Sequence, residues 1–144
     1  MPHIDAAGLS TFVKIVTGKE YWCIGTKNVD DDGRYTISDD PSRGMRWRCL
    51  ALERGDVLYM PPFTPRFVLT TDDCFAAIGH FYNYNCMEKT TKAIVVEHYF
   101  GVNWVNTEHP TAPIILFKML DGLLEKYQYL HNKDHLCKRQ LVVL

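Results

Sequence analysis

Short apolar or β-rich runs, separated by turn residues, recur over the first 82 positions outside the polar stretch 27–43, and Met45–Leu52 alternates apolar and polar residues, a spacing typical of strands. The run Val57–Met60 is preceded by Gly55-Asp56 and followed by Pro61-Pro62, and proline lacks the N–H that a sheet ladder needs. The pattern predicts strands over Thr11–Thr17, Tyr21–Gly25, Met45–Leu52, Val57–Met60, Phe67–Leu69 and Phe75–Tyr82.

The periodicity changes after Tyr82, and helices are predicted over Met87–Phe100 and Pro113–Leu130. In the second helix apolar residues recur at steps of three and four, and Pro113 suits its first turn. Gly18 predicts a hairpin-like turn between the first two strands. The expected fold is mainly β, a double-stranded β-helix (a cupin or jelly-roll-like barrel) followed by C-terminal α-helices. We expect a barrel over residues 1–84, incomplete at its N-terminus, with a helical segment over 85–144 packed on it.

Composition narrows the function classes. The 144 residues are 47% hydrophobic, with a formal net charge of −1, which does not support a general nucleic-acid or membrane-surface binder. No apolar run approaches the ~20 residues of a membrane span, and the N-terminus lacks the features of a signal peptide. Five cysteines without a CxxC predict reduced, buried thiols and an intracellular protein, nuclear or cytoplasmic.

The first chemical motif is His3-Ile4-Asp5. Residues two apart in an extended strand face the same side, so His3 and Asp5 are expected to point at one spot. An imidazole and a carboxylate are two thirds of the facial triad that holds non-haem Fe(II). His3 and Asp5 are therefore the predicted metal ligands.

Three blocks in this order resemble a JmjC domain, most of all the JmjC-like proteins of fungi. They are HIDAAGLSTFVKIVTGKEYW at 3–22, GDVLYMPP at 55–62 and GHFY at 79–82. The resemblance implies a cupin-like dioxygenase that uses Fe(II) and 2-oxoglutarate to hydroxylate or demethylate a protein, with a partner such as a histone. Because elements that precede the His-x-Asp strand in the family are absent here, we expect a truncated or degenerate member.

Carried over by residue, the resemblance places the first two iron ligands at His3 and Asp5 and the third at Arg66, which has no lone pair to offer. The 2-oxoglutarate lysine falls near Lys19 and Glu20, and we assign cofactor binding to Lys19 and Thr11. Glu20 aligns with the lysine itself, which would leave Lys19 facing away unless a bulge shifts the register.

These substitutions leave two function classes open. One is a JmjC-like oxygenase whose activity is weak or lost because of Arg66, and the other is a non-catalytic binding or scaffold module with the same fold. His80 could replace the missing third iron ligand, and the alternative is that it is a structural histidine. His131 and His135 would lie on the same face of a helix. They would either bind a metal ion as a pair or lie in solvent at the end of the helix. The acidic stretch within 27–43 is interpreted as a solvated loop rather than a calcium loop.

Overall fold

The computed structural model describes residues 1–27, 44–101, 104–105 and 107–137, with side chains described as far as residue 129. The predicted acidic loop therefore lies outside the described residues, as do the side chains of His131 and His135. The elements, in chain order, are η1 (Ala6–Gly8), β1 (Ser10–Thr17), β2 (Lys19–Lys27), β3 (Met45–Glu53), β4 (Val57–Met60), β5 (Arg66–Thr70), β6 (Phe75–Phe81), η2 (Tyr84–Cys86), α1 (Met87–Phe100) and α2 (Ala112–Cys137).

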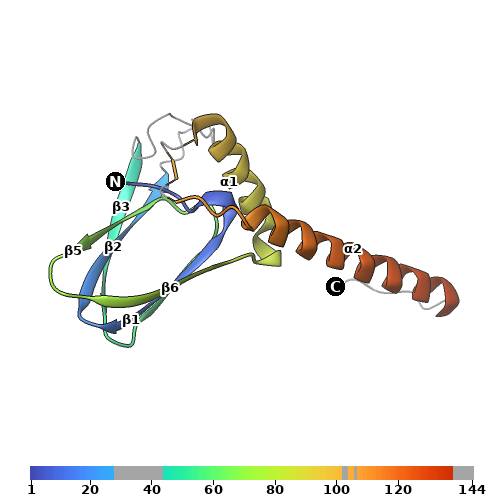
Figure 1. The fold of residues 1–144 in the computed structure, drawn as a ribbon, viewed down its shortest axis with the longest axis horizontal. Helices are drawn as coiled ribbons and strands as arrows, with labels where there is room; N and C mark the ends of the chain where they lie inside the picture. Colours follow the sequence, from blue (N-terminus) through green and yellow to red (C-terminus); the bar gives the residue numbers. More distant parts are fainter. Residues whose placement is uncertain (28–43, 102–103, 106, 138–144) are drawn as a thin grey trace. The chain divides into compact units, whose positions relative to one another are not determined.

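The strands form two antiparallel three-stranded sheets, ordered β4-β1-β6 and β3-β2-β5 (Figure 1). The predicted fold class, mainly β and jelly-roll-like with C-terminal helices, is confirmed. The hairpin expected at Gly18 is wrong, because β1 and β2 belong to different sheets. Gly18 has φ of +79°, and an added Cβ would collide with the backbone of Asp73. Glycine is therefore needed in the tight turn by which the chain passes from one sheet to the other.

The apolar core lies between the inner faces of these sheets. In β1, Thr11, Val13 and Ile15 are buried while Phe12 and Lys14 are exposed, as the alternation in the sequence predicts. One buried cluster comprises Val13, Ile15, Trp22, Leu52 and Met60.

A second cluster fixes the N-terminal segment. Ile4 is fully buried with Ala93, Val96 and Trp104, so it ties residues 3–8 to α1. Gly8 has φ of +64° and lies against the backbone of Thr90, where a Cβ has no room. The Thr90 hydroxyl donates a 2.8 Å hydrogen bond to the Gly8 carbonyl. This packing holds Asp5, which lies between Ile4 and η1.

Two cysteines overturn the expectation of reduced thiols. Cys23 and Cys49 form a disulfide across the β2–β3 pair, where they lie directly opposite each other. The sequence placed the two strands but not their register, and register decides which residues face each other. Cys74 and Cys86 are free thiols.

The chain divides into two compact units, residues 1–109 and 110–144. The first holds both sheets and α1. The second contains α2, which begins one residue before the predicted helix and continues to Cys137, about two turns past the predicted end at Leu130. The predicted domain boundary at residue 84 and the packing of segment 85–144 on the barrel stay predictions. Within the described residues, no helix combines the length and apolar character needed to cross a bilayer.

Candidate functional site

The candidate site is built where the N-terminal segment meets the start of β5. His3 and Arg66 exchange two backbone hydrogen bonds, from His3 N to Arg66 O at 3.0 Å and from Arg66 N to His3 O at 2.9 Å. Arg66 is the first residue of β5 and is 4% exposed, and Asp5 is 7% exposed. This short pairing brings the predicted second ligand position, Asp5, and the predicted third, Arg66, to one buried place.

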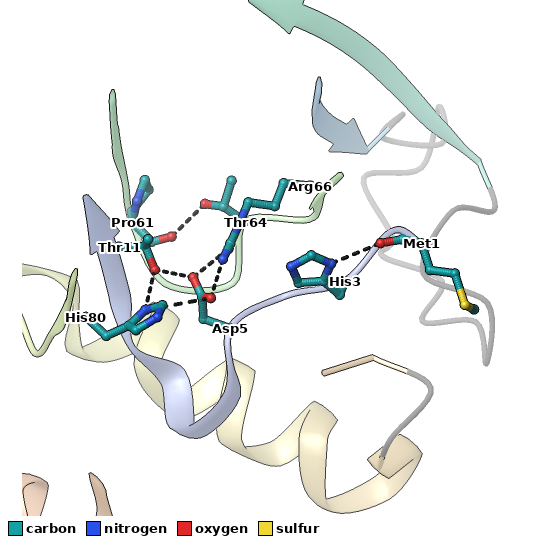
Figure 2. Close-up of polar contacts among 8 residues, drawn as sticks. All are labelled: Met1, His3, Asp5, Thr11, Pro61, Thr64, Arg66 and His80. Carbon is teal, nitrogen blue, oxygen red and sulfur yellow. Dashed lines mark hydrogen bonds and ion pairs between the residues drawn. The ribbon is translucent and has the colours of Figure 1, made fainter. Parts of the chain in front are cut away.

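Asp5 and Arg66 form a two-pronged ion pair (Figure 2). Arg66 Nη1 donates to Asp5 Oδ2 at 2.5 Å, and Nη2 donates to Oδ1. The guanidinium carbon also lies 5.8 Å from the centre of the Trp22 ring. Two parallel charge-assisted bonds are the strongest contact that these side chains can make. Both carboxylate oxygens that would face a metal are thus bound to a cation.

The pKa of Asp5 is determined by opposing effects. Burial raises it, because a buried carboxylate loses its hydration. The hydrogen bonds and charge of Arg66, with a hydrogen bond from Thr11, outweigh burial and hold the pKa of Asp5 below its ordinary value. Asp5 is therefore ionised near neutral pH and acts only as a hydrogen-bond acceptor.

Thr11, which is buried, and His80, which is partly exposed, extend this pair into a polar network. The Thr11 hydroxyl, itself fully buried, donates to Asp5 Oδ2, and His80 Nδ1 lies 2.9 Å from the same hydroxyl oxygen. His80 Nδ1 also lies 3.8 Å from Asp5 Oδ1. Among the described residues, no buried side-chain nitrogen or oxygen lacks a hydrogen-bond partner. Thr11, predicted to bind a cofactor, is here a partner of Asp5.

His3 does not join this network through its ring. Its Nδ1 donates a 3.0 Å hydrogen bond to the main-chain oxygen of Met1, and Figure 2 shows the ring on the Met1 side. Burial lowers the pKa of His3, and the neighbouring Arg66 lowers it further, against the Met1 hydrogen bond and Asp5, which raise it. The structure thus places His3 and Asp5 close along the chain but gives them different partners.

Lys19 and Glu20 lie in β2, away from this network. The Lys19 ammonium pairs with Glu53 Oε1 at 3.1 Å, on a partly exposed surface, and lies 5.4 Å from the Tyr21 ring centre. Glu20 accepts hydrogen bonds from Trp22 Nε1 at 3.1 Å and from Thr70 Oγ1 at 3.2 Å. Glu20 thus points to the side of Trp22, while Lys19 points to the other side, as the alternation of a strand requires.

The residues of this site do not fit a three-ligand iron centre. The facial triad needs three side chains with free lone pairs, and the guanidinium of Arg66 supplies none. The carboxylate of Asp5 is already neutralised by Arg66. In the part of the chain that the structure describes, no three His, Cys, Asp or Glu side chains gather closely enough to hold a metal ion.

Known proteins add little to this geometry. No family model and no curated protein matches the chain. A solved structure of YcfD, a ribosomal oxygenase from Escherichia coli, is 22% identical with a TM-score of 0.40, covering 85% of this chain and 34% of that chain. YcfD in complex with cobalt and 2-oxoglutarate is 21% identical with a TM-score of 0.40, covering 90% and 36%. The chain spans about a third of these structures, and so distant a likeness transfers neither activity nor ligands.

Sequence reasoning identified the unusual residue but missed its partner. Arg66 was recognised as unable to bind iron, yet its buried ion pair with Asp5 was not foreseen. One feature of the sequence could have indicated the ion pair: Asp5 and Arg66 carry opposite charges, and the resemblance places both of them in the same site. The ring centres of His80 and His109 are 4.8 Å apart, and nothing in the sequence indicated this contact.

Proposed function

We propose that this chain is a JmjC-like barrel in which a buried ion pair has replaced the iron centre, and that it serves as a non-catalytic binding module. The observation that carries the proposal is the two-pronged contact of Arg66 with Asp5. A metal ion would have to displace the guanidinium of Arg66, a residue that is 4% exposed and donates hydrogen bonds to both carboxylate oxygens of Asp5. The alternative, an oxygenase of low activity, requires Arg66 to leave this contact.

The surroundings of the pair support loss of 2-oxoglutarate binding as well. The cosubstrate carries two carboxylates and needs a cation facing the inner side of the barrel. Lys19 is turned outward and bound to Glu53, and Glu20 presents a negative charge beside Trp22. The partner we propose is a protein surface, as for the family that the motifs resemble.

The test is Fe(II) binding by calorimetry under argon, with and without 2-oxoglutarate. We expect no binding by the parent chain that depends on 2-oxoglutarate. Arg66→His supplies an imidazole in place of the cation, and Arg66→His with Glu20→Lys should gain Fe(II) affinity that 2-oxoglutarate increases. Micromolar binding by the parent, increased by 2-oxoglutarate, would overturn the proposal.

Two control variants separate the causes. Arg66→Met removes the cation without supplying a ligand, so it should gain no 2-oxoglutarate-dependent binding. Asp5→Asn in the Arg66→His, Glu20→Lys background should abolish the gain, because the carboxylate is then missing. If the gain survives Asp5→Asn, the ion has bound elsewhere and the assignment of the vestigial centre is wrong.

A further inference from the structure

Two imidazoles, those of His80 and His109, lie next to each other at the edge of this polar network. His80 lies in β6, and His109 is the last residue of the first compact unit. Their ring centres are 4.8 Å apart and the ring planes are inclined by 54°. Both rings are partly exposed, so water and small ions can reach them. His80 and His109 are not at the three positions to which the resemblance assigns the iron ligands, although His80 lies in the block at 79–82.

The network fixes which nitrogen of His80 carries the proton. Asp5 is held ionised by Arg66 and can only accept, so the single hydroxyl proton of Thr11 is donated to Asp5. The Thr11 oxygen must then accept the proton of His80 Nδ1, 2.9 Å away. In the neutral ring this leaves the lone pair on Nε2. Carboxylates and hydrogen-bond acceptors orient metal-binding histidines in this way.

We propose that His80 and His109 form a two-imidazole site for a divalent transition-metal ion, with water completing the coordination. Metal–nitrogen bonds of about 2.0–2.1 Å at angles near 90–110° put the centres of two ligating rings roughly 5 Å apart. The observed separation of 4.8 Å between the two ring centres agrees with this distance. Imidazole suits Zn²⁺, Ni²⁺ and Cu²⁺, unlike the hard ions Ca²⁺ and Mg²⁺.

The local charges permit a cation here. The charges of Arg66 and Asp5 offset each other, so the nearby guanidinium does not repel a second cation as a lone arginine would. The ion pair of Asp5 and Arg66 is therefore compatible with a cation bound at the two imidazoles.

The test is Ni²⁺ binding by calorimetry at pH 7.5, with Zn²⁺ as the second ion. Because His131 and His135 are spaced to chelate on a helix, the background is the full chain carrying His131→Gln and His135→Gln. We expect saturable binding of one Ni²⁺, weakened at least tenfold by His109→Gln. His98→Gln is the matched control, because His98 contacts Tyr99 on α1, and it should leave the affinity unchanged.

Nuclear magnetic resonance gives a readout that does not depend on variants. Ni²⁺ is paramagnetic, so substoichiometric ion should broaden the imidazole signals of His80 and His109 and spare that of His98. Absence of binding in the background chain, or affinity unchanged by His109→Gln, would overturn the inference. Ni²⁺ binding that increases with 2-oxoglutarate but survives His109→Gln would overturn it and the proposed function together.

Discussion

The barrel holds two neighbouring buried clusters of opposite character. One is the apolar cluster of Val13, Ile15, Trp22, Leu52 and Met60 between the sheets. The other is the polar cluster of Asp5, Thr11 and Arg66, nearly as buried, and Trp22 contacts both. Apolar packing loses stability gradually as atoms are removed, whereas an ion pair fails when either partner is lost. The polar cluster is therefore more sensitive to the loss of a single side chain than the apolar cluster is.

The largest expected effect is that of Arg66→Met. This change leaves Asp5 charged and buried without its partner, which costs about 3–5 kcal/mol of unfolding free energy. Urea denaturation followed by tryptophan fluorescence measures the loss. The double variant Asp5→Leu, Arg66→Met should recover most of it, since two apolar residues leave no charge unpaired. A single-variant loss below about 1 kcal/mol would show that the pair is solvated and the two clusters are alike.

The disulfide is expected to contribute next. It closes a 26-residue separation between Cys23 and Cys49, so the loop-entropy model assigns it about 3.5 kcal/mol. Reductant should lower the urea midpoint of the parent chain by a corresponding amount. The variant Cys23→Ala, Cys49→Ala should not respond to reductant, while Cys74→Ala should respond like the parent. A parent midpoint indifferent to reductant would show that β2 and β3 need no covalent link.

A third change tests the gradual response of the apolar cluster. Ile15 is fully buried, and Ile15→Val removes one methylene group, for which a loss of about 0.5–1.5 kcal/mol is expected. Equilibrium unfolding in urea is again the measurement. The exposed neighbour Val16 provides the control, because Val16→Ala should change stability by less than about 0.5 kcal/mol. A loss from Ile15→Val as large as that from Arg66→Met would remove the contrast between the clusters.

The smallest expected effect is that of pH. Folding lowers the pKa of His3 and His80, chiefly through burial, so the unfolded chain binds protons more readily as the pH falls through about 6.5. Stability should therefore decline between pH 7.5 and pH 5.5. The pKa of Asp5 is also lowered, and its contribution is lost only in stronger acid. Melting temperatures by circular dichroism test this, and His80→Asn should flatten the profile.

The apolar and β-rich runs of the sequence, with the turn residues between them and the helical periodicity after them, were sufficient to predict much of the fold. Six strands and two helices lie close to the predicted ranges, because burial on one face imposes a period of two or of about 3.6 whatever the partner. The hairpin at Gly18 was wrong because a tight glycine turn serves equally to pair two strands or to cross between sheets. The Cys23–Cys49 link was missed because it depends on register, which local pattern does not determine.

By itself, the sequence determined that Arg66 cannot bind a metal ion, since the identity of a side chain decides whether it has a lone pair. Only the tertiary structure decided what Arg66 does instead. Its contact with Asp5 spans 61 positions, and the contact of Thr11 with His80 spans 69. Interactions over such distances arise from sheet pairing and packing, so no local pattern records them. The contact of His80 with His109 could not be predicted for the same reason, because it depends on the path of the chain after α1.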